Sequence, residues 1–181
     1  MRRRNREGGA TLIEAAIIMP IMILIMIGTL EVGLAFKDYL TVSYATREGS
    51  RVGALAGNDT DADCEIVQTV VDTLGGADDL EDFVGLQIFE ADPTTGNRIV
   101  ANTNTWLLVG SDPYDCANDW TIAENWPATS RNTAFGASSQ LDIIGVRIGY
   151  THDWITGFPP FSGSFMVDEQ TIIRMEPESF E

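Results

Sequence analysis

A long apolar segment, residues 10–30, places the strongest constraint on this chain, and Glu14 is its one charged residue. A helix of this length, with a rise of about 1.5 Å per residue, covers the roughly 30 Å hydrocarbon core of a bilayer. A cleaved secretory signal has a shorter apolar region of roughly 7 to 15 residues, followed closely by a small-residue cleavage site. The segment therefore predicts a membrane-inserted helix, and an ordinary signal peptide fits it less well.

Charge on the two sides of this segment predicts its orientation. The basic leader, residues 1–9, contains four arginines. The residues that follow the segment mix Lys37, Arg47 and Arg51 with acidic side chains. By the positive-inside rule the N-terminus stays in the cytoplasm and the rest of the chain crosses. We therefore expect a single-pass protein of the inner, or cytoplasmic, membrane with an external C-terminal part.

The predicted external part is strongly acidic. From Asn58 onward there are 22 Asp and Glu residues against four Arg, and the whole chain has a formal net charge of −16. Such a surface repels phosphate backbones and anionic lipid headgroups. We therefore expect no nucleic-acid partner, and we expect the helix to provide the attachment to membrane lipid. Roughly 120 residues are enough for one small domain with its own core.

Helical periodicity continues beyond the apolar segment. Residues 31–56 contain no proline, and their apolar residues recur at roughly helical spacing between charged ones. One helix over residues 10–56 has a length of about 70 Å. The amphipathic continuation, residues 31–56, has an apolar stripe that needs a partner, and the simplest partner is the domain formed by residues 57–181.

That acidic domain is predicted to be α+β. Thr60 or Asp61 can cap a short helix over residues 62–74. Residues 102–140, rich in Asn, Ser and Thr, read as a long loop held in place by Trp106, Trp120 and Trp126. Runs of β-forming residues around a hairpin turn at 92–97 predict three or four antiparallel strands, at residues 84–91, 98–101, 141–150 and 164–175. The predicted fold is thus a long N-terminal transmembrane helix that continues into a small domain with a short helix and a three- to four-stranded antiparallel sheet.

The two cysteines, Cys64 and Cys116, both lie in polar sequence. Outside the cytoplasm an even pair of thiols usually oxidises. Closing a loop of about 52 residues contributes roughly 4 kcal/mol in the chain-entropy model. We predict a Cys64–Cys116 disulfide, with two free structural thiols as the rival. No metal site is expected, because two cysteines and the distant His152 provide too few ligands.

The junction between leader and apolar segment resembles the signal of a class III (type IV-like) prepilin. The resemblance lies in the arginine-rich leader, Gly9 and the sequence ATLIE at residues 10–14. In that family an inner-membrane peptidase cuts after the glycine, and a glutamate is the fifth residue of the mature chain. The resemblance implies that a prepilin peptidase cuts between Gly9 and Ala10, which leaves Glu14 at that fifth position.

Glu14 allows two interpretations. A carboxylate in hydrocarbon is costly unless it is paired or neutralised, so the new N-terminus of a neighbouring subunit could pair with it and set axial register during assembly. Alternatively, Glu14 lies in the first turns of the helix, where the helix dipole favours an anion and the side chain reaches the interface. The spacing alone does not separate the two.

Further motifs extend the resemblance to a specific branch of type IV pili. Over about residues 8–53 the chain is similar to the N-terminal module of TadE-like proteins of the tight adherence pilus. The matching sequences are Gly9-Ala10, Glu14-Ala15, Pro20, Glu31-Val32-Gly33 and ATREGSR at residues 45–51, with weaker similarity at 142–148 and 174–177. The resemblance implies a minor pilin or pseudopilin whose partners are other pilins and pilus assembly platform proteins, and whose place is the membrane or the pilus. The sequence gives no chemical role for Thr46 to Arg51.

No motif predicts an enzyme. His152 is the single histidine, and the chain contains neither a nucleophile elbow nor a glycine-rich phosphate loop. Asp59, Asp61 and Asp63 imitate the start of an EF-hand loop, but Cys64 stands where glycine is required. We expect no catalysis, no cofactor and no metal. The alternative function is a single-pass membrane-anchored extracellular binding module with the tryptophan-containing loop as its ligand surface.

Overall fold

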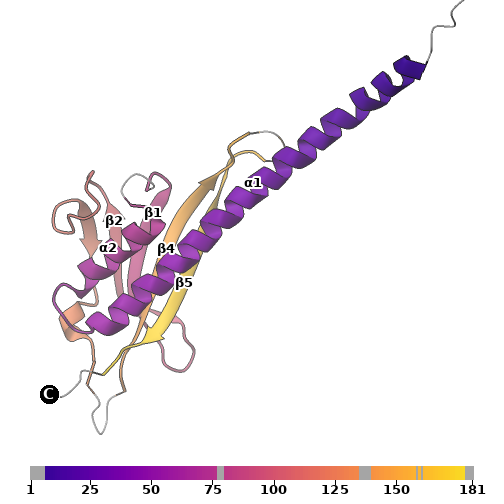
Figure 1. Cartoon of the computed structure of the whole chain (residues 1–181). Coiled ribbons are helices and arrows are strands. Elements are labelled where there is room, and N and C mark those ends of the chain that lie inside the picture. Colours follow the sequence, from indigo (N-terminus) through magenta and orange to yellow (C-terminus); the bar gives the residue numbers. More distant parts are fainter. Residues whose placement is uncertain (1–6, 77–79, 135–139, 158, 160, 178–181) are drawn as a thin grey trace, which may run out of the picture. The chain divides into compact units, whose positions relative to one another are not determined.

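The structure is a computed structural model, and it describes residues 7–76, 80–134, 140–157, 159 and 161–177. Among these residues, five strands form one antiparallel sheet in the order β3-β2-β1-β4-β5, together with two α-helices (Figure 1). The elements are α1 (Glu7–Ala56), α2 (Ala62–Leu74), β1 (Phe83–Ala91), β2 (Arg98–Leu108), β3 (Trp120–Ala123), the 3-10 helix η2 (Ala128–Ser130), β4 (Ile143–Asp153) and β5 (Ser164–Arg174). The predicted α+β class with a long N-terminal apolar helix is confirmed.

The helix α1 is 50 residues long and continues through Pro20. It ends where Gly57 takes a φ of 60°, a conformation that glycine adopts without the steric cost of a Cβ. The second helix, α2, ends in the same way at Gly75, whose φ is 121°. Both helices thus end at the residues that the sequence predicts, Ala56 and Leu74, and a glycine with positive φ follows each. At the start of α2, Asp61 is the N-cap residue, although its side chain makes no capping hydrogen bond.

The chain divides into two compact units, which we describe separately. The helical unit contains residues up to Lys37 together with the segment Asp153–Ser164, which joins β4 to β5. The sheet unit contains Asp38–His152 and the residues from Phe165 onward. The helix α1 therefore contributes its first part to one unit and its last part to the other.

The sheet unit is a two-layer sandwich. Residues 38–56 of α1 and the whole of α2 cover one face of the sheet (Figure 1). This packing confirms that the domain itself is a partner for part of the apolar stripe of the outer helix. The core between the layers consists of buried aliphatic and tryptophan side chains, among them Val42, Ala45, Ile66, Val70, Leu86, Ile88, Trp106, Ile144, Val146 and Ile148.

The sheet is larger than the sequence predicts. The strand β2 continues to Leu108, and β3 lies within the segment expected to be a loop, where its residues 120–123 pair with residues 105–108 of β2. The predicted strand stops at residue 101 because polar residues follow in the middle of β2, and asparagine is depleted in strands. Asn104 is nevertheless fully buried and hydrogen-bonded in the structure.

The hairpin turn between β1 and β2 forms at residues 92–97 as predicted. The carboxylate of Asp92 accepts hydrogen bonds from the backbone N–H groups of Thr94 and Thr95, at 2.9 and 2.7 Å. These bonds hold the pKa of Asp92 below its ordinary value. Gly96 completes the turn with a φ of 70°.

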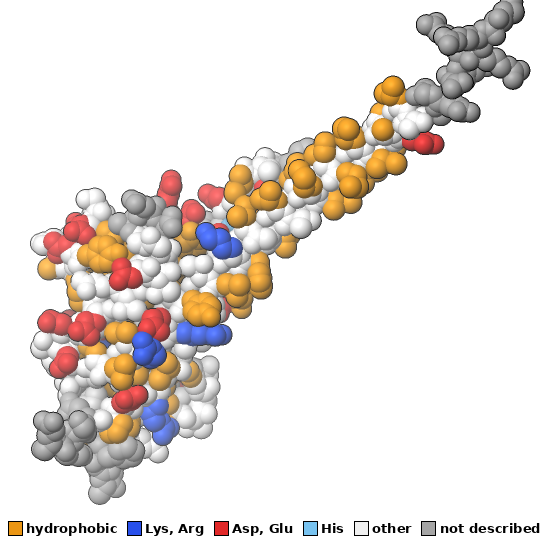
Figure 2. All heavy atoms as spheres, viewed as in Figure 1, with side chains coloured by type: hydrophobic (Ala, Val, Ile, Leu, Met, Phe, Trp, Pro, Cys, Tyr) orange, Lys and Arg blue, Asp and Glu red, His pale blue; other side chains and the backbone are white. Residues whose placement is uncertain are grey.

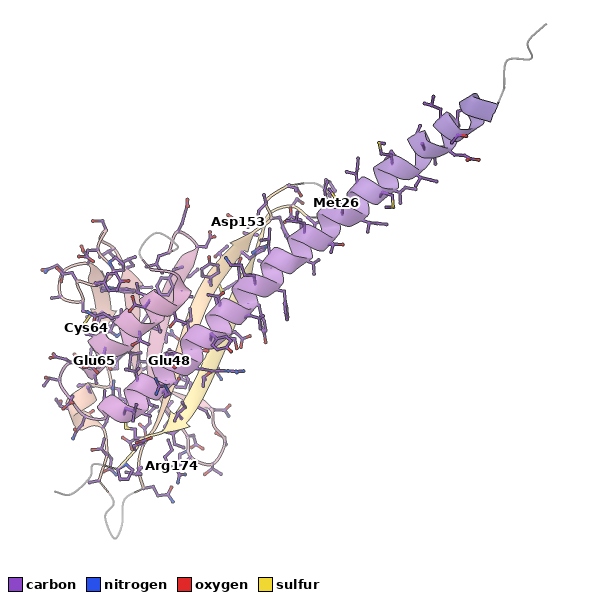
Figure 3. The ribbon with its side chains drawn as sticks, viewed as in Figure 1. Met26, Glu48, Cys64, Glu65, Asp153 and Arg174 are labelled. Carbon is purple, nitrogen blue, oxygen red and sulfur yellow. A yellow bond between two sulfur atoms is a disulfide. The ribbon has the colours of Figure 1, made fainter. Side chains whose placement is uncertain are left out.

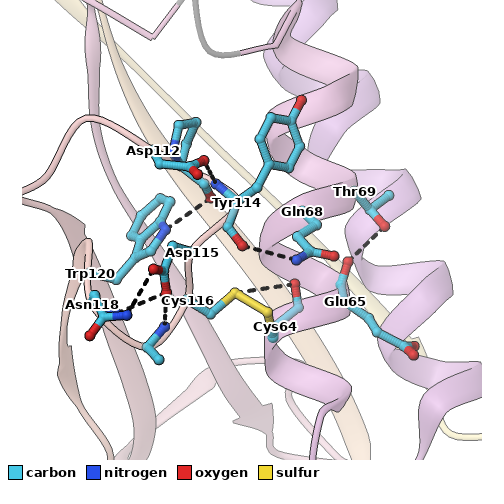
Figure 4. Close-up of a disulfide and its surroundings, with 12 residues drawn as sticks. Cys64, Glu65, Gln68, Thr69, Asp112, Tyr114, Asp115, Cys116, Asn118 and Trp120 are labelled. Atoms are coloured by element: carbon cyan, nitrogen blue, oxygen red, sulfur yellow. Dashed lines mark hydrogen bonds between the residues drawn. A yellow bond between two sulfur atoms is a disulfide. The ribbon is translucent and has the colours of Figure 1, made fainter.

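The predicted disulfide between Cys64 and Cys116 is present, with an S–S distance of 2.02 Å. It joins α2 to the loop between β2 and β3 (Figure 4). Two side chains hold the same loop: the Gln68 amide donates to the carbonyl of Tyr114 at 3.1 Å, and the Trp120 indole donates to the carbonyl of Pro113 at 3.0 Å. The disulfide thus fastens an irregular acidic loop to the helical layer.

Candidate functional site on the N-terminal helix

The first part of α1 exposes large apolar side chains. Among the described residues, one helix, Thr11–Ala56, contains a stretch that is long and apolar enough to cross a membrane, and none of that stretch is buried. Figure 2 shows apolar side chains along this part of the helix and acidic side chains over the visible face of the sheet unit. The exposed residues include Leu12, Ile13, Ile17, Ile18, Met19, Ile21, Met22, Ile25 and Met26. A single helix of this kind fits a single-pass membrane anchor.

Glu14 lies on this exposed part of the helix. Among the described residues of the single chain, it has no hydrogen-bonding or ion-pairing partner. The backbone at Gly9 and Ala10 is helical. The structure describes side-chain environments on this helix from residue 11 onward, so the environment of the predicted cleavage site is not among them. The structure of one chain therefore leaves the predicted processing site and the predicted pairing of Glu14 as predictions.

A second glutamate, at the other end of the apolar segment, has the opposite environment. Glu31 is 1% exposed. Its carboxylate accepts hydrogen bonds from the backbone N–H groups of Ile155 and Thr156, at 3.2 and 2.6 Å, all within the helical unit. A buried carboxylate is costly without such partners, so these two bonds offset part of the cost of its burial. Sequence reasoning named Glu31 only within a motif, and a lone acid at the end of an apolar run is the signal that marks it.

Within the sheet unit, two glycines one helical turn apart let α1 approach its neighbours closely. A Cβ built on Gly49 would lie 2.8 Å from Cγ2 of Val70 in α2. A Cβ built on Gly53 would lie 2.7 Å from Cδ1 of both Ile66 and Ile144. Carbon atoms in contact normally stay about 3.5 to 4.0 Å apart. Both positions therefore require glycine for the helix to pack at this distance.

Two hydroxyl side chains on the same part of α1 bind the edge strand β5. Ser50 donates from Oγ to the carbonyl of Thr171 at 2.8 Å. The hydroxyl of Thr46 lies 3.1 Å from the hydroxyl of Thr171 and also donates to the carbonyl of Ser43 at 2.9 Å. Thr46 and Ser50 are 1% and 0% exposed, so these are interior hydrogen bonds. They fix α1 along β5 by directional contacts in addition to apolar packing.

The remaining residues of this segment point to solvent. Arg51 donates from Nε to Glu48 at 3.1 Å, and both side chains are exposed (Figure 3 labels Glu48). The hydrogen bond from Arg51 holds the pKa of Glu48 below its ordinary value. Residues 46–51 therefore alternate between a buried face of small and hydroxyl side chains and a charged outer face. This arrangement supplies the structural role that the sequence alone does not reveal.

These features coincide with a known family. Residues 9–51 match the family model described as TadE-like protein. The chain is TadE-like in this N-terminal module. The match covers the apolar segment, Glu14, Glu31 and the helical face of Thr46 and Ser50, and it ends before the sheet begins. Neither the curated proteins nor the solved structures contain a match to the chain. We refer to residues 9–51 as the TadE-like module.

The TadE-like module also contains one residue of a partly buried contact between an aspartate and the histidine. Asp38 Oδ2 lies 2.7 Å from Nδ1 of His152, whose side chain is 4% exposed. The His152 ring also stacks at an angle on Phe165, with 5.1 Å between ring centroids. The single histidine of the sequence is thus an interior residue that joins α1 to the end of β4.

Outside the module, a buried polar network replaces the imitated EF-hand. Asp63 forms an ion pair with Arg131, and the Asn104 amide donates to its other carboxylate oxygen at 2.8 Å. Asn104 Oδ1 accepts from the backbone N–H groups of Asn125 and Trp126 at 2.8 and 2.7 Å. The third acidic residue of the imitated motif therefore binds an arginine and an amide in the interior.

The three tryptophans of the predicted loop lie in the core next to this network. Trp106, Trp120 and Trp126 are all 5 to 6% exposed and belong to the core. The Arg131 guanidinium lies 4.6 Å from the centre of the Trp126 ring. These side chains hold the β2–β3 region together as predicted, and because they are buried they are not themselves exposed to a ligand.

Proposed function

We propose that this protein is a minor pilin, or pseudopilin, that takes part in the assembly of the tight adherence, or Tad, pilus and carries no enzymatic activity. The observation that supports this proposal is the division of one helix into two parts. The first part exposes apolar side chains and a lone carboxylate, and the second part is fixed to a small domain by Gly49, Gly53 and Ser50. Such a chain suits an assembly subunit, because its free part is available for lipid or for other helices while its domain stays folded.

The exposed apolar part serves two environments in this proposal. In the inner membrane its side chains contact lipid. In a filament, the same side chains pack against the corresponding helices of other pilins. Transfer between the two environments needs no new apolar surface, because both are apolar.

Glu14 supplies specificity in this transfer. Its carboxylate has no partner among the described residues of the single chain, and isolated charge in an apolar environment is costly. Cleavage after Gly9 by a prepilin peptidase creates a positively charged amine at Ala10. Pairing of that amine in one subunit with Glu14 in the next would fix their axial register.

The first test reads the N-terminus of the protein by mass spectrometry after expression with and without a prepilin peptidase. A new terminus at Ala10 that disappears when Gly9 is substituted supports pilin-type processing. An intact leader in the presence of active peptidase contradicts the proposal. It would instead favour a permanently anchored module.

The second test addresses Glu14. We expect Glu14→Ala to insert into the membrane normally and to enter pilus fractions less than wild type does. Glu48→Ala is the matched control, because Glu48 is a carboxylate on the same helix that faces solvent and pairs only with exposed Arg51 among the contacts described. Equal incorporation of Glu14→Ala and wild type would remove the register role and leave the helix-dipole interpretation.

A further inference from the structure

The segment that joins β4 to β5 lies against α1 at the end of the apolar segment. Within the helical unit, a Cβ built on Gly28 would lie 3.3 Å from the Phe161 ring, and Glu31 binds the backbone of Ile155 and Thr156. Figure 3 labels Met26 on the helix and Asp153 at the end of β4, and the ribbon between β4 and β5 lies beside the helix at this level. The segment is thus fixed at the last turn of the part of α1 that is predicted to cross the membrane.

We refer to residues 154–157, 159 and 161–163 as the aromatic loop. Trp154 and Phe161 contact each other with 5.1 Å between ring centroids, and Ile155 is 71% exposed. In the sequence, no charged residue occurs from Trp154 to Val167, although the chain contains 27 acidic residues. An uncharged, partly exposed apolar loop is therefore present on an otherwise acidic protein.

The backbone of this loop is prepared for a poorly hydrated environment. The N–H groups of Ile155 and Thr156 donate to the Glu31 carboxylate, and the N–H of Trp154 donates to the carbonyl of Gly163 at 3.3 Å. Unpaired backbone donors are costly away from water, so internal partners lower the cost of moving the loop out of water. Glu31 thus both holds the loop against α1 and provides acceptors for two backbone N–H groups that would otherwise need water.

We propose that the aromatic loop inserts into the headgroup region of the outer leaflet of the membrane that α1 spans. Tryptophan and other amphipathic aromatic side chains are enriched at this depth. The loop contacts α1 at Gly28 and Glu31, where the apolar segment ends. This is the level of the headgroups when residues 10–30 span the hydrocarbon core, and the aromatic side chains of the loop suit that level. The acidic surface of the rest of the domain is repelled by anionic headgroups, which leaves the uncharged loop as the part suited to this contact. The inference rests on the membrane insertion of α1 in the proposed function.

The test uses the full chain in vesicles of phosphatidylcholine with phosphatidylglycerol as the minor lipid. The described part of the chain has no free cysteine, and the two cysteines of the sequence are joined, so one introduced thiol can carry a polarity-sensitive fluorophore. Labels are placed on Ile155→Cys in the loop, Met22→Cys in the apolar helix and Val100→Cys on β2. All three residues are exposed apolar residues, with exposed fractions of 71%, 62% and 73%.

We expect lipids that carry a nitroxide near the headgroup to quench the label at position 155 strongly. The emission of this label should also shift to shorter wavelength. The label at position 100 should be quenched little, and its emission should stay at the wavelength of a water-exposed label. Adding Glu31→Ala should remove most of the quenching at position 155, because the loop loses its attachment to α1. Adding Glu48→Ala, the solvent-facing control on the same helix, should leave the quenching unchanged.

Two outcomes would overturn the inference, and they are distinguishable. If the emission of the label at position 22 shifts to shorter wavelength while the labels at 155 and 100 are quenched equally weakly or equally strongly, the loop has no specific membrane contact, and the proposed function is unaffected. If the emission of the label at position 22 does not shift, α1 does not insert, and both the inference and the membrane part of the proposed function fail.

Discussion

The two parts of α1 share one secondary structure but differ in what surrounds them. The stretch rich in isoleucine, leucine and methionine exposes nearly every side chain, whereas Val42, Ala45, Ser50 and Ala54 in the last part are at most 3% exposed. The exposed part is also the more apolar of the two. Apolar composition by itself therefore does not decide which part of a helix is buried within its own chain.

Side-chain size explains the difference. The first part carries bulky residues, and the last part presents Ala45, Gly49, Gly53 and Ala54 to α2 and the sheet. Small side chains let a helix approach a neighbour closely enough for many contacts, whereas large apolar side chains suit a fluid partner such as lipid. In this helix, small and hydroxyl side chains at helical spacing mark the part that packs against the domain. Large apolar side chains mark the part that is exposed.

The largest expected effect tests whether the two parts are energetically independent. Replacing both Cys64 and Cys116 by serine should lower the free energy of unfolding of the sheet unit by about 4 kcal/mol, since the disulfide closes a loop of 52 residues. Denaturant unfolding of the detergent-solubilised chain, followed by tryptophan fluorescence, measures this change. Vesicle flotation should be unchanged, and a loss of flotation would show that insertion depends on the folded domain.

The next effect tests whether glycine is what docks the second part. Gly53→Leu places a side chain where Ile66 and Ile144 already lie, so we expect a loss of about 3 kcal/mol in the same unfolding experiment. The control is Gly33→Leu in the first part, where a built Cβ meets nothing within 4 Å. If both variants are equally stable, close approach of the helix is not required for docking.

A smaller effect tests the hydrogen bonds to β5. Ser50→Ala removes the donor to the Thr171 carbonyl inside the protein and should cost about 1 kcal/mol. Thr29→Ala is the matched control, because that hydroxyl is exposed and bonds to the carbonyl of Ile25 in its own helix at 2.8 Å. We expect the control to change the free energy of unfolding by much less; similar losses in both would assign the effect to helix propensity.

The smallest effect concerns the exposed face of the sheet. Arg147 donates from Nε to Asp168 at 2.6 Å, and this hydrogen bond holds the pKa of Asp168 below its ordinary value. Because the folded-state pKa is lower than the unfolded one, the contribution to stability is present above about pH 4, the unfolded value. It disappears as the pH falls through the folded value.

Asp168→Asn tests this pair. Both side chains are about one third exposed, so the variant should lose at most about 1 kcal/mol at neutral pH. The difference between variant and wild type should shrink as the pH falls below about 4. A difference that stays constant down to the acid limit would show that the carboxylate charge is not its source.

Several local features could be predicted because they depend on neighbouring residues alone. The C-terminal ends of both helices follow from periodicity and from the glycines after them, whereas α1 begins at Glu7, three residues before the predicted start. The turn at Asp92 follows from its side chain bonding to the next backbone donors. The disulfide follows from two cysteines in polar, external sequence.

Other features depend on residues distant in the chain and could not be predicted. The strand β3 exists because β2 offers it an edge, and the buried Asn104 in β2 is satisfied by Asp63 and by the backbone of Trp126. The burial of Glu31 depends on a loop more than a hundred residues away. In each case the partner, and hence the energetic reason, is absent from the local sequence.

The sequence by itself determined that residues 10–30 form an apolar helix with one carboxylate, because length, hydrophobicity and charge are local and additive quantities. It also determined the TadE-like character of residues 9–51. Only the tertiary structure decided that Gly49, Gly53 and Ser50 attach α1 to a five-stranded sheet and that Glu31 holds the aromatic loop at the end of the apolar segment. These are contacts between distant segments, and their energies exist only once packing has brought the two surfaces together.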